Sequence, residues 1–281
     1  MKETYSGVIE LSFKKQKDRT IADRTYRRGN SRISANIPIA GETPCYFLIS
    51  TGGGFVEGEN YLQTIHLGPD THAILTTQTP NYIYKCVHGN TTRQKMVLSA
   101  EDRSILEFYI DETIPYQNAI YQQDTEIELG QGTRLILTDG LSSGWSPDGA
   151  PFTYGRIGQH IRIKKNGKLL YNDYLLVDPR TENMEELGFF EGMSCFHSAA
   201  ILDDSIDKGM ISSMRAVLDA LDTPARYGIS LLEEGGAALR ILGPDPDANH
   251  KVMWTWISFY REQILGFPHI NLRKSGRAEG Y

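Results

Sequence analysis

A long succession of short apolar runs, separated by turn residues, constrains this fold more than any other feature. In residues 8–13, Ile9, Leu11 and Phe13 alternate with polar residues, which is typical of a strand with one buried face. Asn166-Gly167, the strongest hairpin signal in the chain, joins two such runs. Strands spaced about every 8–12 residues predict a sandwich, a barrel or another all-β stack. The predicted strands cover residues 8–13, 46–49, 61–67, 72–79, 81–87, 94–98, 104–110, 125–129, 133–137, 157–163, 168–176 and 194–202.

The chain beyond residue 203 has a helical pattern instead. Apolar spacing predicts helices over 207–221 and 247–265, with a hairpin over 226–241 between them. Trp254 and Phe259 lie outside the apolar stripe of the second helix, which indicates burial on more than one side, either inside the domain or against a partner. We expect one unit over 1–281, in three parts. They are a β-rich part over 5–203, the helix–hairpin–helix part over 207–265 and a flexible tail over 273–281.

Charge and length exclude several classes of function. The chain has 281 residues and a formal net charge of −6, so nucleic acids and anionic membranes are poor partners. It lacks the roughly 18-residue apolar stretch of a membrane helix, and residues 1–20 lack the apolar core of a secretion signal. Three cysteines (Cys45, Cys86 and Cys195) are an odd number for a disulfide framework. These features predict a cytoplasmic protein.

Two glycine-rich motifs resemble catalytic signatures without their context. Residues 140–144 match G-x-S-x-G around Ser142, but turn residues follow where a nucleophile elbow needs a helix. Residues 52–58 lack the Lys and Ser/Thr of a phosphate-binding loop, and their glutamates repel phosphate. We interpret the second motif as a tight, bulged turn where backbones approach closely.

Two Cys-x-His pairs offer metal ligands. Cys86 and His88, and likewise Cys195 and His197, are two residues apart, so each pair shares one face of a strand. If the strands were neighbours, the four side chains would form a tetrahedral site for zinc or nickel. The spacing differs from the usual structural zinc signature, and buried cysteines are common core residues.

Several ordered segments resemble the urease accessory protein UreD (UreH) family. They are STGGGFVEGE at 50–59, LTTQTPNYIYK at 75–85, Leu106-Glu107 with Glu112-Thr113-Ile114, GWSPDG at 144–149 and the Asn166-Gly167 hairpin. Their order and spacing match the family from about residue 5 to residue 245. Two departures exist: Glu59 stands where the family usually has Asp, and residues 108–111 lack the usual prolines.

The resemblance implies a function that composition alone does not show. It implies a β-helix-like stack of many short strands with two C-terminal helices. It also implies a non-enzymatic scaffold and chaperone that binds apo-urease and UreF, and through UreF the GTPase UreG. Nickel passes transiently through such a protein, with no tightly bound cofactor. The family's lack of GTPase activity agrees with the missing phosphate-binding loop.

A protein that conducts Ni²⁺ needs oxygen and imidazole ligands that release the ion. The matching motifs offer Glu59, Glu107, Glu112 and Asp139 as nickel-transit candidates, with Thr76 and Thr77 as neutral wall residues. An alternative is that these side chains stabilise turns and strand edges.

The aromatic residues of the second helix, Trp254, Trp256 and Phe259, are candidates for contact with UreF. Two other functions stay open at this point. One is a β-helix-type carbohydrate-active enzyme using carboxylates such as Glu107 and Asp139. The other is a metal-storage protein using the Cys-x-His pairs.

Overall fold

A computed structural model describes residues 4–37, 39, 41–272 and 274, so all but one residue of the predicted tail lies outside the described part. The strands are β1 (Gly7–Gln16), β2 (Arg19–Gly29), β3 (Ser31–Ile33), β4 (Cys45–Ser50), β5 (Asn60–Leu67), β6 (His72–Thr77), β7 (Asn81–Ile83), β8 (Thr92–Ala100), β9 (Ile105–Tyr109), β10 (Thr113–Pro115), β11 (Ile120–Leu129), β12 (Arg134–Ser142), β13 (Arg156–Lys165), β14 (Lys168–Val177), β15 (Cys195–Leu202), β16 (Arg226–Leu231) and β17 (Gly236–Gly243). The helices are α1 (Lys208–Asp219), α2 (Pro246–Tyr260) and the π-helical turn η1 (Arg261–Leu265).

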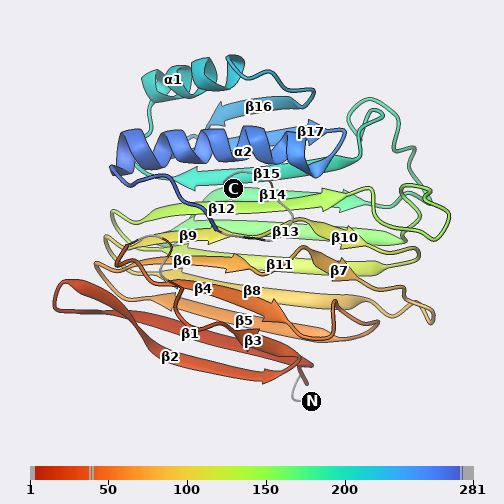
Figure 1. Cartoon of the computed structure of the whole chain (residues 1–281), viewed down its shortest axis with the longest axis horizontal. Coiled ribbons are helices and arrows are strands. Elements are labelled where there is room, and N and C mark those ends of the chain that lie inside the picture. The colour runs from red at the N-terminus through yellow and green to blue at the C-terminus, as the bar shows by residue number, and fades with distance from the viewer. Residues whose placement is uncertain (1–3, 38, 40, 273, 275–281) are drawn as a thin grey trace.

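The chain alternates between two sheets and so forms a solenoid-like stack (Figure 1). The first sheet has the order β14-β13-β11-β8-β5-β1-β2. The second has the order β16-β17-β15-β12-β9-β6-β4-β3, with β10 beside β12 and β7 beside β10. Strands β1, β5, β8, β11 and β13 are parallel to one another, as are β4, β6, β9 and β12. The mainly β, stacked-strand prediction is therefore confirmed.

Antiparallel strands close both ends of each parallel stack. In the first sheet, β2 pairs with β1 and β14 pairs with β13. The β13–β14 turn has Asn166 at φ 49° and Gly167 at φ 78°, the left-handed conformations that this hairpin requires. Strand β2, which apolar patterning did not predict, is an exposed edge rich in arginine.

Apolar side chains fill two layers. Alternate residues of both sheets, such as Ile65 of β5 and Phe108 of β9, pack between the sheets. The opposite face of the second sheet packs against α1 and α2, for example through Ile74 and Ile201. The central strands β6, β9, β12 and β15 are consequently buried on both faces, which is why their apolar runs are nearly continuous.

The predicted helix–hairpin–helix segment is present as α1, β16–β17 and α2. Helix α2 begins at an N-cap, Asp245, whose side chain accepts a hydrogen bond from the Ala248 N–H at 2.8 Å. Trp254 and Trp256 of α2 are only 3% and 0% exposed and belong to the core under the helices, whereas Phe259 is partly buried. The off-stripe aromatic pattern thus coincides with burial inside the chain.

The glycine-rich turn of residues 52–58 has the predicted close backbone approach. Gly52 and Gly53 have positive φ, and a Cβ on Gly54 would lie 2.6 Å from the Tyr82 carbonyl oxygen. The Phe55 N–H donates to that same carbonyl at 2.8 Å. The glycines therefore let this loop join the edge of β7.

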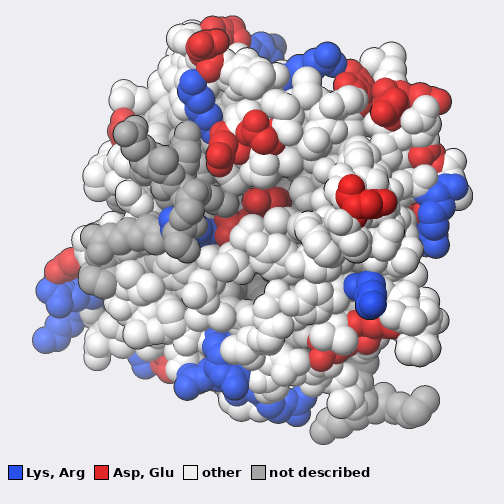
Figure 2. All heavy atoms as spheres, turned by 45° about the vertical axis from the view of Figure 1, so that its right-hand side comes forward, with Lys and Arg blue, Asp and Glu red and all other residues white. Residues whose placement is uncertain are grey.

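On the face shown in Figure 2, carboxylates lie along the upper part and inside a central recess. Basic side chains lie among them at the top and also near the lower edge and the sides. Within the described part of the chain, no helix has the length and apolar character needed to cross a membrane.

Candidate metal centre

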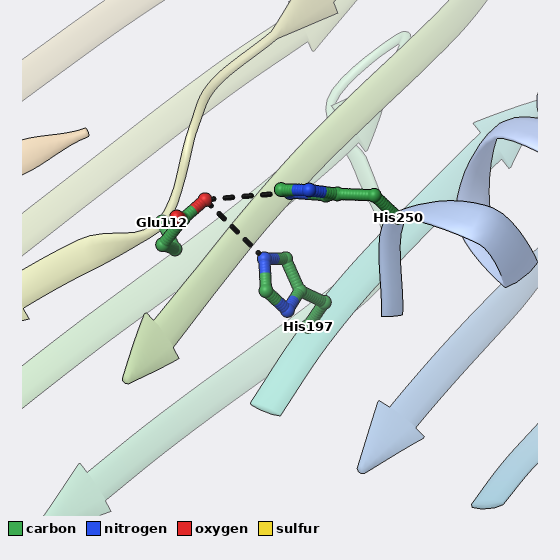
Figure 3. A group of neighbouring side chains, drawn as sticks. All are labelled: Glu112, His197 and His250. Atoms are coloured by element: carbon green, nitrogen blue, oxygen red, sulfur yellow. Dashed lines mark hydrogen bonds and ion pairs between the residues drawn. The ribbon is translucent and has the colours of Figure 1, made fainter. Parts of the chain in front are cut away.

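Three buried side chains from distant parts of the sequence converge above the second sheet. Glu112 Oε2 lies 3.5 Å from His197 Nε2 and 3.4 Å from His250 Nε2. Figure 3 shows both imidazole rings directed at the one carboxylate. Among the described residues, this is the one group of His, Cys, Asp and Glu whose ligand atoms lie close enough to hold a metal, all within 4.8 Å of one another.

Each ligand comes from a different kind of element. Glu112 follows β9 in the segment that leads to β10, and His197 lies on β15. His250 lies near the start of α2, where the Asp245 cap fixes the orientation of the first turn. All three are at most 3% exposed.

The strand under this group provides space for it. Gly140 of β12 pairs with His197 in the sheet register. A Cβ on Gly140 would lie 2.7 Å from His197 Cδ2 and 3.1 Å from Glu112 Cβ. Any larger residue at this position would push the histidine and the glutamate apart.

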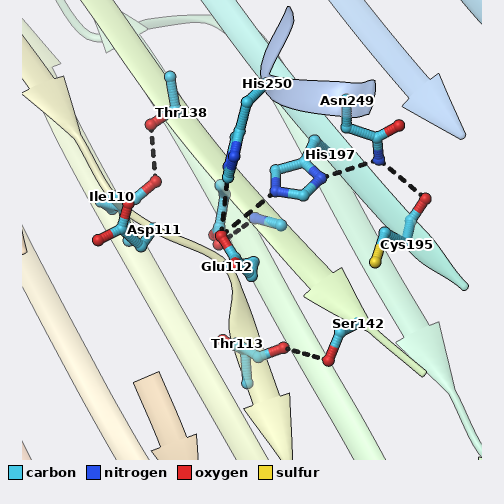
Figure 4. A network of polar contacts seen from close by, with 12 residues as sticks. Ile110, Asp111, Glu112, Thr113, Thr138, Ser142, Cys195, His197, Asn249 and His250 are labelled. Carbon is cyan, nitrogen blue, oxygen red and sulfur yellow. Dashed lines mark hydrogen bonds and ion pairs between the residues drawn. The ribbon is translucent and has the colours of Figure 1, made fainter. Parts of the chain in front are cut away.

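Asn249 determines the proton position on His197 (Figure 4). Its Nδ2 lies 2.9 Å from both the Cys195 carbonyl oxygen and His197 Nδ1. Because a carbonyl only accepts, the amide presents its NH₂ group on this side. His197 Nδ1 therefore accepts, which places the proton of the neutral ring on Nε2, facing Glu112.

Electrostatics stabilise the ionised form of Glu112. Burial raises the pKa of this carboxyl, but hydrogen bonds from His197 and His250 outweigh burial and hold its pKa well below the ordinary value. A carboxylate between two imidazoles is a ligand set that borderline divalent cations accept.

Glu107, the neighbouring candidate, is held differently. His72 Nε2 contacts its Oε1 at 2.6 Å, and the Tyr109 hydroxyl and the Arg261 guanidinium both contact its Oε2. The π-helical turn η1 begins at Arg261, which is 1% exposed. Glu107 is thus neutralised by a permanent cation inside the core.

Asp139, a third candidate, points to the other face of the second sheet. It accepts hydrogen bonds from Gln123 Nε2 at 2.5 Å, Gln159 Nε2 at 2.8 Å and the Gly140 N–H at 2.8 Å. Gln94, Gln123 and Gln159 form one row across β8, β11 and β13. Burial raises the pKa of Asp139 to about 7, although these hydrogen bonds oppose the rise.

The structure thus places Glu107 and Asp139 on opposite faces of one sheet, and does not bring them together as a carboxylate pair. Glu59 lies apart from both, at the glycine-rich turn, where its carboxylate accepts from Asn30 Nδ2 at 3.0 Å and from the Tyr61 hydroxyl.

The two predicted wall residues are hydrogen-bonded inside the core. Thr76 Oγ1 donates to the Tyr109 carbonyl oxygen at 2.7 Å. Thr77 Oγ1 donates to Asp111 Oδ2 at 3.0 Å. The Thr76 hydroxyl therefore links β6 to β9, and the Thr77 hydroxyl links β6 to the segment that follows β9.

The two Cys-x-His pairs do not form one tetrahedral group. His88 is exposed and contacts Glu57 at 3.2 Å, while Cys86 hydrogen-bonds the backbone of Ile120. Burial raises the pKa of the Cys195 thiol to about 12, so that thiol stays protonated. Of the four residues, His197 alone belongs to the group with Glu112.

The sequence pointed to Glu112 and His197 separately but not to His250 as a ligand. His250 carries no local signal, because the contact depends on how α2 packs across β15. Ser142 ends β12 and donates to the Thr113 carbonyl oxygen at 3.5 Å, and a turn follows it.

Comparisons with known proteins agree with one another. The family model described as UreD urease accessory protein matches residues 5–275. The chain is 38% identical to the urease accessory protein UreD of Streptococcus thermophilus, over 98% of this chain and 99% of that protein. It is 30% identical to the UreD of Lachnoclostridium phytofermentans, over 85% and 87% of the two chains. The chain therefore belongs to the UreD family of urease accessory proteins.

Proposed function

We propose that this chain is a non-enzymatic scaffold that acts with UreF and, through UreF, with the GTPase UreG in the cytoplasm. It binds apo-urease and assists nickel insertion into the urease metallocentre, with nickel as a transient cargo. The observation that carries the proposal is the UreD family match over nearly the whole chain, which supports a role in urease maturation. The buried set of one carboxylate and two imidazoles is compatible with that cargo.

Co-expression tests this function directly. Urease structural subunits are produced with UreF and UreG in the presence or absence of this chain, in nickel-containing medium. We expect active, nickel-loaded urease only when the chain is present, and co-purification of the chain with UreF and with apo-urease. Equal urease activity and nickel content without the chain would reject the proposal.

The contact with UreF involves Phe259. Of the three aromatic candidates on α2, Phe259 alone is only partly buried and so keeps surface that a partner can reach, whereas Trp254 and Trp256 are inside the core. Phe259→Asp should reduce co-purification with UreF without changing the unfolding midpoint by much. Trp254→Asp should instead destabilise the core, because it places a charge at a buried site. Full co-purification of the Phe259→Asp variant would exclude this contact.

A further inference from the structure

We propose that Glu112, His197 and His250 form a site for one divalent cation of the borderline class, with an affinity that Asn249 keeps low. This site deepens the proposed function. It rests on that function only in naming nickel as the expected cation. Imidazole and carboxylate ligands together suit Zn²⁺, Fe²⁺ and Ni²⁺ better than they suit Mg²⁺ or Ca²⁺.

Two of the three separations between ligand atoms already match coordination distances, and the third, between His197 and His250, is within 4.8 Å. Tetrahedral bonds of about 2.1 Å place neighbouring ligand atoms about 3.4 Å apart. The two measured separations from Glu112 Oε2 are 3.5 Å and 3.4 Å. Three protein ligands leave one position open, which is the arrangement of metal sites that exchange a ligand.

Gly140 gives an independent reason to regard this group as a site. Gly140 has an ordinary extended backbone in the interior of β12, where a glycine weakens a strand. Its missing side chain leaves room beside the Nε2 atom of His197, since a Cβ there would lie 3.0 Å from that nitrogen.

Asn249 explains why binding should be weak. A cation binds His197 Nε2 through the lone pair of that nitrogen. In the present tautomer the same nitrogen carries the proton, so the cation and the proton compete for it. The other tautomer carries its proton on Nδ1, where it meets the NH₂ group of Asn249. The amide must then turn over, which gives up the hydrogen bond to the Cys195 carbonyl.

Rotation of the Asn249 side-chain amide breaks no hydrogen bond at its oxygen. Asn249 is fully buried, and its Oδ1 has no hydrogen-bond partner among the described residues. After the turn, Oδ1 accepts from His197 Nδ1–H, as the outer partners of metal-bound histidines do. Asn249 is therefore a positioning residue that couples cation binding to a choice between two amide orientations.

The test uses the purified full chain after chelator treatment, with Ni²⁺ and the spectroscopic probe Co²⁺. We expect one equivalent of Co²⁺ to give the visible absorption of a nitrogen-ligated site. We also expect Glu112→Gln and His250→Gln to weaken Ni²⁺ binding at least tenfold in equilibrium dialysis. His72→Gln is the matched control, because His72 also contacts a buried glutamate but lies outside the group. Equal binding by wild type, Glu112→Gln and His250→Gln overturns the site.

Two further variants separate ligand loss from misfolding. Gly140→Ala keeps all three ligands and should weaken binding by crowding them. Asn249→Asp supplies an acceptor for His197 Nδ1–H and should tighten Ni²⁺ binding about ten- to a hundredfold, a gain that damage to the fold does not produce. Unchanged affinity in Asn249→Asp overturns the role given to Asn249.

The same variants distinguish this site from the proposed function. Loss of Ni²⁺ binding in Glu112→Gln with normal urease activation in co-expression would support the site and reject its use in nickel delivery. Unchanged binding with lost activation would reject the site and leave the proposed function standing.

Discussion

Glu107 and Glu112 are both buried beneath the helices, yet their environments differ in kind. Glu107 contacts a guanidinium that cannot give up its proton, so its charge is compensated permanently. Glu112 contacts two imidazoles, which can release protons and offer lone pairs instead. The difference favours a structural role for Glu107 and the proposed ligand role for Glu112, although the sequence presented both as equivalent candidates.

The largest expected effect comes from breaking the Glu107 pair. Arg261→Met leaves a buried carboxylate without its cation and should destabilise the fold by about 3–5 kcal/mol. Chemical denaturation of the purified variant measures this loss. The double variant Arg261→Met/Glu107→Gln should recover most of it, because no buried charge is left uncompensated.

The matching test at Glu112 replaces one of its two imidazole partners. His250→Gln keeps a donor near Glu112, so its unfolding free energy should fall by less than half of the Arg261→Met loss. An equal loss in both variants would contradict the distinction between the two carboxylates.

Asp139 adds a carboxylate that has only neutral donors among the partners named above, and it should respond to pH. Its pKa is raised from 3.8 to about 7 by burial, so the folded state binds this proton more tightly than the unfolded state does. The resulting stability is complete below about pH 4 and is lost as the pH rises through about 7. Between pH 5 and 7, wild type should lose about 2 kcal/mol relative to Asp139→Asn in denaturation experiments. Parallel pH profiles of the two proteins would show that Asp139 is already ionised at pH 5.

The smallest effect is expected at His88, which is 80% exposed at the side chain. His88→Gln should leave both the unfolding midpoint and the bound nickel unchanged, since exposed ion pairs contribute little. Nickel measured by mass spectrometry after dialysis checks this. A marked loss of metal there would restore the Cys-x-His hypothesis.

Local pattern predicted most strands but not the contacts that make the candidate site. The 61–67 and 157–163 runs became β5 and β13, because alternation records which face of a strand is buried. Strand β2 lacks that alternation since both of its faces are largely solvent-accessible. The contact between Glu112 and His250 joins the segment after β9 to helix α2, and no spacing along the chain encodes it.

The charged strand β2 has a consequence for the molecule as a whole. A stack of parallel strands ends in unpaired backbone groups that a second copy could extend. Here the last strand of the first sheet carries Arg24, Arg27 and Arg28 on an exposed edge, where a like-charged neighbour is repelled. Strand β2 thus opposes strand pairing with a second copy at this edge of the first sheet.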